Sequence, residues 1–128
     1  MKPLTREWIG KAEGDFATVR REVQARKAPN YDAACFHAQQ CIEKYLKARL
    51  QEAEIPFGRT HDLSALLNLL LPIESSWESL RPHLRTLTAF AVGVRYPGES
   101  ADKAMAREAL ALCRDVRRDV RLSLGLEP

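Results

Sequence analysis

The stretch that decides the fold runs from Phe36 to Ala48 and reads FHAQQCIEKYLKA. It is rich in strong helix formers and contains no glycine or proline. On a helical wheel, one broad apolar arc collects Ala34, Ala38, Cys41, Ile42, Tyr45 and Leu46. Phe36 and Leu50 fall toward a second apolar strip, which is typical of a helix at the centre of a bundle or in an interface. We therefore expect a central helix from about Tyr31 to Ala53, with Asn30 as its cap.

Outward from this helix, helix-forming stretches alternate with breakers, and no hairpin signal such as Asn-Gly or Asp-Gly occurs. The breakers predict four more helices, over about 5–26 with Thr5 as cap, 62–71, 82–94, and from Ser100 or Asp102 to 124. A short helical turn is also expected at Ser75 or Ser76. The prediction is an all-α, up-and-down bundle of four to five helices, with residues 1–128 forming a single domain.

The composition excludes several classes of protein. The net charge is +3, from 20 basic and 17 acidic residues, which is well short of a dedicated nucleic-acid binder, so a nucleic-acid partner is not expected. Cys35, Cys41 and Cys113 are odd in number and form no CxxC pair, which argues against disulfides or zinc and favours core packing in a reducing cytoplasm. No apolar signal core or membrane-spanning stretch is visible.

The quoted segment resembles the second helix of prokaryotic HEPN proteins, which commonly has the form F/H-x-A-Q-Q-A-x-E-K-x-L-K-A. The resemblance continues at Thr60-His61-Asp62-Leu63, which is similar to the family's entry into the third helix, and at Arg95-Tyr96-Pro97-Gly98, which is similar to its Arg-Tyr-Pro segment after the fourth. The three segments occur in the family's order and span most of the chain. The resemblance implies a helical bundle that commonly dimerises and is often encoded beside, or fused to, a minimal nucleotidyltransferase.

Some HEPN proteins are ribonucleases that use an Arg-x4–6-His motif at a dimer interface. No arginine stands five to seven positions before His37, His61 or His83, and no histidine stands five to seven positions after Arg95. The chain departs from that part of the family, so the nuclease activity is not carried over.

Two residues after the fourth helix, Arg95 and Tyr96, are the leading binding candidates. Arginine suits bidentate recognition of phosphate or carboxylate, and tyrosine offers a stacking face. The alternative is that Arg95 forms an internal ion pair with Glu43 or Asp62 while Tyr96 closes the base of the bundle.

Four further polar residues are candidates for the same ligand. His37 lies at the edge of the apolar arc and Gln40 on its polar side, where they could line a polar cleft; alternatively His37 is bonded to a neighbouring helix. His61 and Arg59 precede a helix N-terminus that could receive an anion; alternatively Asp62 caps that helix and His61 packs beside it.

Catalysis has little support, because no phosphate loop, metal-ligand cluster or nucleophile triad is present in the sequence, and no cofactor or metal is expected. The leading hypothesis is a non-catalytic HEPN-type protein that forms a homodimer, partners a minimal nucleotidyltransferase and offers a site for a nucleotide or polyphosphate. The alternatives are a ribonuclease toxin of a toxin–antitoxin pair with a displaced active site, and a purely structural dimerisation module.

Overall fold

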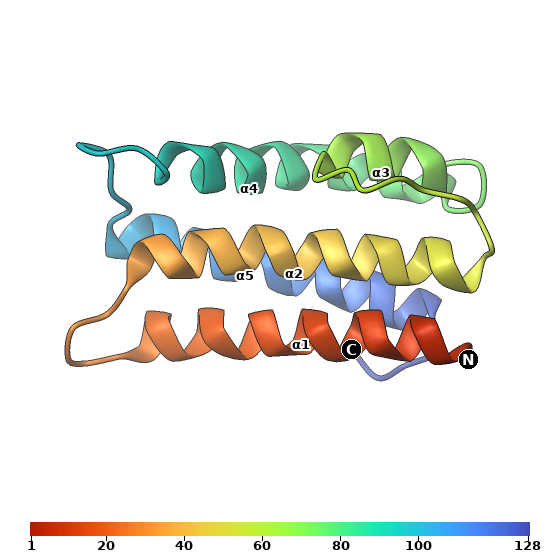
Figure 1. Cartoon of the computed structure of the whole chain (residues 1–128), viewed down its shortest axis with the longest axis horizontal. Helices are drawn as coiled ribbons and strands as arrows, with labels where there is room; N and C mark the ends of the chain where they lie inside the picture. The colour runs from red at the N-terminus through yellow and green to blue at the C-terminus, as the bar shows by residue number, and fades with distance from the viewer.

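The chain folds into helices throughout, as the sequence predicted. The computed structural model describes residues 1–128, and it contains no strand. In chain order the elements are α1 (Pro3–Gln24), α2 (Tyr31–Glu52), α3 (Leu63–Leu70), the short 3-10 helix η1 (Ser75–Leu80), α4 (Arg81–Gly93) and α5 (Lys103–Ser123). Figure 1 shows α1 below, α2 and α5 in the middle, and α3 and α4 above them.

The central position predicted for α2 is confirmed, since it packs against α1, α3, α4 and α5. Its two apolar strips serve different neighbours, which is why its apolar side chains extend beyond one arc. The core that surrounds it is aliphatic and contains no disulfide; the largest fully buried side chains include Tyr45, Ile42, Leu46, Leu66 and Leu84.

Three of the expected helix caps are present. The side chain of Asn30 accepts a hydrogen bond from the backbone N–H of Ala33, and Asp102 accepts one from Met105. Asp62 accepts from two N–H groups in the first turn of α3. Each cap satisfies donors that a helix start leaves without an intrahelical partner, so the breakers located these three helices correctly.

The predicted start of α1 at Thr5 is wrong. The helix begins at Pro3, whose missing N–H costs nothing in the first turn, and Lys2 stands at the cap without a side-chain bond. Thr5 is fully buried inside the helix, where its hydroxyl donates to the carboxylate of Glu52 at 2.9 Å. A threonine near a helix start therefore joins α1 to the end of α2 and does not cap α1.

The three cysteines are buried and unpaired, in keeping with the expected packing role. Burial raises the pKa of the Cys35 thiol to about 11, with a smaller contribution from nearby carboxylates. No helix combines the length and apolarity needed to cross a bilayer.

Candidate functional site

Along the junction of α1 and α2, the first of two carboxylate-centred clusters forms around Asp15. This side chain is nearly buried, and its two oxygens take different partners. One oxygen lies 2.7 Å from Nδ1 of His37, and the other accepts from Nζ of Lys44 at 2.5 Å. Because an ionised carboxylate only accepts, Nδ1 carries the proton and Nε2 is left as the free ring nitrogen. His37 is thus bonded to a neighbouring helix, as the alternative interpretation of this residue expected.

The second cluster lies further along α2, around Glu43. Its side chain is only 4% exposed and accepts from Nζ of Lys47, itself 6% exposed, at 3.1 Å. The other oxygen lies 3.0 Å from Nδ1 of His61, whose side chain is 76% exposed. The buried carboxylate therefore holds an imidazole that stands at the surface with Nε2 free.

Two glutamines of α2 lie between the clusters. Gln40 donates to the side-chain oxygen of Gln39, which in turn donates to the backbone carbonyl of His61 at 3.2 Å. The structure thus brings three of the sequence candidates, His37, Gln40 and His61, onto one polar side of α2. Gln39 fixes the segment that carries His61 and Arg59 against the helix.

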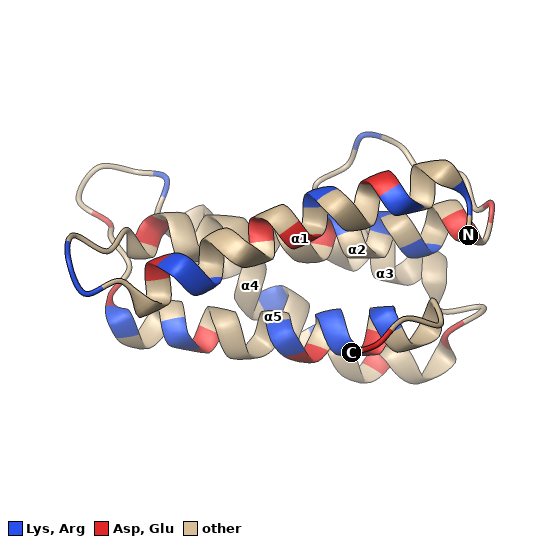
Figure 2. Cartoon of the chain, turned by 90° about the horizontal axis from the view of Figure 1, so that it is seen from below, with Lys and Arg blue, Asp and Glu red and all other residues tan.

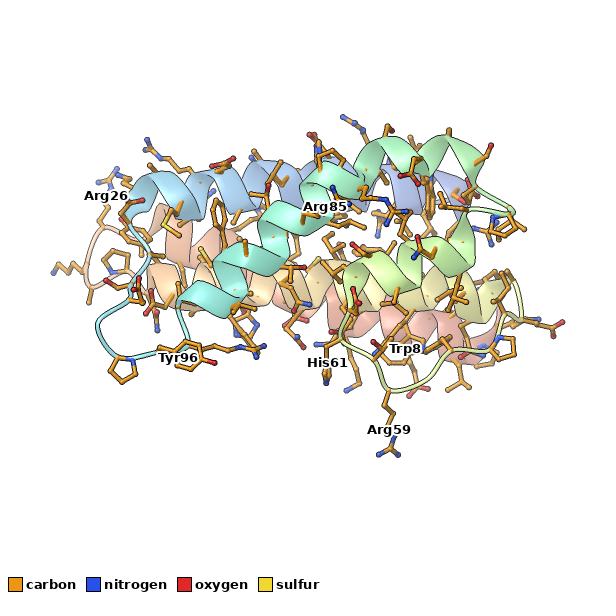
Figure 3. All side chains as sticks on the ribbon, turned by 90° about the horizontal axis from the view of Figure 1, so that it is seen from above. Trp8, Arg26, Arg59, His61, Arg85 and Tyr96 are labelled. Atoms are coloured by element: carbon orange, nitrogen blue, oxygen red, sulfur yellow. The ribbon has the colours of Figure 1, made fainter.

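Beside the Glu43 cluster lies a hollow of about 480 Å³. We call it the loop pocket, because the segment between α2 and α3 forms one wall. Its lining residues are Trp8, Glu43, Lys47, Phe57, Gly58, Arg59 and His61. Trp8 and Phe57 meet edge to face at 6.1 Å between ring centroids, and Nζ of Lys47 lies 5.5 Å from the Trp8 ring. Figure 3 shows Trp8, Arg59 and His61 grouped at this edge of the bundle.

The buried Glu43–Lys47 pair is a poor source of stability. Removing two charges from water costs several kcal/mol each, and replacing such a pair by apolar residues is often neutral or stabilising.

The lining of the loop pocket combines two aromatic rings with Lys47, Arg59 and His61. Aromatic faces suit a planar group, and guanidinium and ammonium groups suit anions such as phosphate.

On another side of α1, Glu13 forms a closed network. Its carboxylate accepts from Arg117 of α5 at 2.7 and 2.8 Å and from the hydroxyl of the buried Tyr45 at 2.6 Å. Arg121 also donates to that hydroxyl, at 3.0 Å. Burial alone would raise the pKa of Glu13, but the hydrogen bonds from Arg117 and Tyr45 hold it below its usual value. This network joins three helices and leaves none of its principal groups free.

Arg95 and Tyr96 are not brought to the loop pocket. Both are exposed in the loop between α4 and α5, and Figure 3 shows Tyr96 well separated from His61 along the bundle. The internal ion pair considered for Arg95 is absent, because Glu43 pairs with Lys47 and His61. Tyr96 is 64% exposed and does not close the base of the bundle.

The anion site considered at the start of α3 is also not available. Asp62 already accepts from the N–H groups of Ser64 and Ala65, so these donors are satisfied within the protein. Arg59 and His61 face the loop pocket instead.

Sequence reasoning missed most partner side chains of the clusters and the aromatic pair of the pocket. These residues are Asp15, Gln39, Glu43, Lys44, Lys47, Trp8 and Phe57. Glu43 and Lys47 stand four positions apart on α2, a spacing that signals an ion pair. Trp8 is only partly buried and borders the pocket, although an aromatic residue on an amphipathic helix is more often part of the core. No sequence signal joins Asp15 to His37, because their contact depends on how α1 packs on α2.

Comparison with known proteins agrees with this architecture. A model of the HEPN domain matches residues 5–123. The chain belongs to the HEPN domain family. Among solved structures, the HEPN domain described here is similar to the crystal structure of ST0689, an archaeal HEPN homologue, with 25% sequence identity and a TM-score of 0.66. The similarity covers 96% of this chain and 98% of the archaeal one. No curated protein gives a significant match.

Proposed function

We propose that this HEPN domain binds a nucleotide in the loop pocket. The observation that carries the proposal is the meeting of two aromatic rings with the side chains of Lys47, Arg59 and His61 in one hollow of about 480 Å³. Ligand sites of small molecules fall in this range of size and combine an apolar wall with a few placed polar groups.

Different residues of the pocket contact the base and the phosphates of the proposed nucleotide. The base lies against Trp8 and Phe57, and the phosphates are bound by Arg59, with the imidazole of His61 beside them. Glu43 orients His61 through Nδ1, and Gln39 fixes its backbone. His37 and Gln40 lie on the same side of α2 and extend the polar surface on which the ligand rests.

A thermal-shift titration with ATP tests this proposal, because a ligand that binds only the folded state raises the melting temperature. Arg59→Gln is the informative variant, since Arg59 is exposed and has no carboxylate within 4.0 Å. Arg85→Gln is the matched control, because Arg85 is equally exposed and lies on α4, away from the pocket (Figure 3).

We expect ATP to raise the melting temperature of the wild type and of Arg85→Gln, and to raise that of Arg59→Gln far less. An equal shift in all three proteins would show that ATP binds elsewhere. No shift at millimolar ATP would remove the nucleotide proposal and leave a protein partner as the better hypothesis.

A second part of the proposal concerns self-association. Exposed apolar side chains of the upper layer and its loops, Leu69, Ile73, Val92 and Tyr96, are 40%, 46%, 45% and 64% exposed. Exposed apolar surface favours an interface, and homodimers are the commonest assembly. We propose that the exposed apolar side chains of Val92 and Tyr96, at the end of α4 and just after it, form an interface that mediates a homodimer, with Arg95 beside Tyr96; we call this surface the α4 face. Sedimentation equilibrium tests it: Val92→Asp should shift a dimer toward monomer, whereas a wild-type monomer at high concentration would contradict it.

The family resemblance suggests a minimal nucleotidyltransferase as the partner and a non-catalytic role for this chain. Co-expression with a nucleotidyltransferase encoded beside it, followed by co-purification, tests the partnership. Degradation of RNA by the purified protein, abolished by His61→Ala, would favour the ribonuclease alternative. A purely structural module would leave no hollow beside these polar side chains, so the loop pocket argues against that reading.

A further inference from the structure

The charges of α5 are segregated around the helix, although they alternate along the sequence. At 3.6 residues per turn, all six basic residues fall within a sector of roughly 100°, and the three acidic ones within roughly 40° on another side. The basic residues are Lys103, Arg107, Arg114, Arg117, Arg118 and Arg121, and the acidic ones are Glu108, Asp115 and Asp119. Figure 2 shows the basic positions succeeding one another along the helix. One side of α5 is therefore basic along the length of the helix.

The basic side of α5 faces α1, and a hollow of about 420 Å³ opens between them. We call it the arginine notch; its lining residues are Phe16, Arg20, Arg114, Asp115, Arg117, Arg118 and Pro128. Phe16 of α1 forms its apolar floor. The guanidinium carbons of Arg117 and Arg20 lie 4.5 and 5.8 Å from the centroid of that ring. The aromatic face thus positions one guanidinium from each helix.

Two of the four arginines are compensated within the protein and two are not. Arg117 is paired with Glu13 at 2.7 Å, and Arg118 lies within 4.0 Å of acidic neighbours on its own helix. Arg20 and Arg114 have no carboxylate within 4.0 Å. The notch therefore presents two free guanidinium groups, one from α1 and one from α5.

We propose that the arginine notch binds a chain of two or more phosphates, either free or as the tail of a nucleotide. Adjacent phosphates carry several oxygens on a short flexible chain, and guanidinium groups bind such oxygens in pairs. Two free arginines that project from different helices match two neighbouring phosphates. The site lies on a different side of α1 from the loop pocket, shares no lining residue with it, and does not depend on the nucleotide proposal.

Isothermal titration calorimetry with inorganic tripolyphosphate tests the notch. The titrations use the full chain at physiological salt in the Arg59→Gln background, which removes a cation of the loop pocket. Arg114→Gln and Arg20→Gln are the test variants. Arg107→Gln is the matched control, because Arg107 is an exposed arginine of the same sector outside the hollow. All three remove a surface charge without opening the core.

We expect one tripolyphosphate per chain, at least tenfold weaker binding in each test variant, and less than twofold change in Arg107→Gln. Competition by ATP identifies a nucleotide tail as the bound form, and failure of ATP to compete identifies free polyphosphate. Equal weakening by Arg107→Gln would show only general attraction to the basic side of α5 and would overturn the proposal. Absence of tripolyphosphate binding in the Arg59→Gln background would also overturn the proposal. If the wild type binds tripolyphosphate and Arg59→Gln does not, the phosphate chain belongs to the loop pocket.

Discussion

On two sides of α1, carboxylates meet hydrogen-bonding and basic side chains of other segments, but in opposite arrangements. On one side, Glu13 is bound by Arg117 and by Tyr45, and its principal groups all have partners. On the other, the carboxylates of Asp15 and Glu43 are buried, while His37 and His61 each retain a free Nε2. Both sides join helices through a carboxylate. Only on the second side do buried carboxylates hold side chains that point toward solvent.

The two arrangements have different consequences: the first joins helices, and the second holds exposed side chains in position. A carboxylate that satisfies two cations and a buried hydroxyl stabilises the junction of three helices. A buried carboxylate that orients an exposed histidine adds little stability, because its desolvation offsets most of the ion-pair attraction. Stability therefore does not account for the second arrangement, and ligand binding is the better explanation for it.

The largest expected loss in the free energy of unfolding is from Glu43→Gln. This change leaves Lys47, only 6% exposed, without its charged partner, and breaking one side of a buried pair costs about 3–5 kcal/mol. We expect a loss of about 3 kcal/mol in the free energy of unfolding, measured by urea denaturation.

The double variant Glu43→Met/Lys47→Leu sharpens that test. Replacing both charges by apolar residues should recover most of the stability. It should not recover nucleotide binding, because His61 loses its orienting carboxylate. A double variant as unstable as Glu43→Gln would mean that the pair itself stabilises the fold, and that the comparison between the two sides is wrong.

For the closed side, Glu13→Gln should cost about 1.5 kcal/mol. Hydrogen bonds to charged groups contribute about 1.5–3 kcal/mol, and the lower end applies because the Glu13 side chain is 35% exposed and partly screened by solvent. Urea denaturation measures the change. Glu7→Gln, an exposed glutamate on the same helix, is the control and should change stability by less than about 0.5 kcal/mol. ATP binding should be unaffected in both.

The contribution of Glu13 should also depend on pH in a defined direction. Its pKa in the folded protein lies below the ordinary value of 4.5, so the folded state favours the ionised form. The stabilisation is therefore fully present above pH 4.5 and is lost as the pH falls through the lowered folded value. The difference in stability between wild type and Glu13→Gln should be flat from pH 6 to 7 and shrink below pH 4.5. A difference that grows on acidification would contradict this.

The smallest effect on stability is expected from Tyr96→Ala. Tyr96 is 64% exposed and its side chain makes no hydrogen bond within the protein, so the free energy of unfolding, measured by thermal denaturation at low protein concentration, should change by less than about 0.5 kcal/mol. Sedimentation equilibrium should nevertheless show a weaker dimer if the α4 face mediates association. An unchanged dimer would place the interface elsewhere.

Much of the fold could be predicted from the sequence, because local signals determine it. Asn30, Asp62 and Asp102 cap the helices they were expected to cap, since a cap acts on donors two or three residues away. The failure at Thr5 has a non-local cause: its hydroxyl is satisfied by Glu52, 47 positions away in the chain.

The site was only partly predictable, for the same physical reason. His37, Gln40, His61 and Arg59 were found through residue type and family resemblance. Asp15, the partner of His37, and Trp8, one of the two aromatic rings of the pocket, come from α1, and only the packing of α1 on α2 brings them to these residues. Arg95 and Tyr96 suit phosphate and base recognition by type, but the α4–α5 loop carries them away from the pocket.

Fluorescence of Trp8 during titration with ATP tests the central claim most directly. Trp77→Phe removes the other tryptophan, a buried residue of η1, so that excitation at the red edge of tryptophan absorption reports on the pocket alone. The account predicts saturable quenching of Trp8 by ATP that weakens at least tenfold in Arg59→Gln and is unchanged in Arg85→Gln. Emission that stays constant up to millimolar ATP, or quenching equal in all three proteins, would contradict a nucleotide site at the loop pocket.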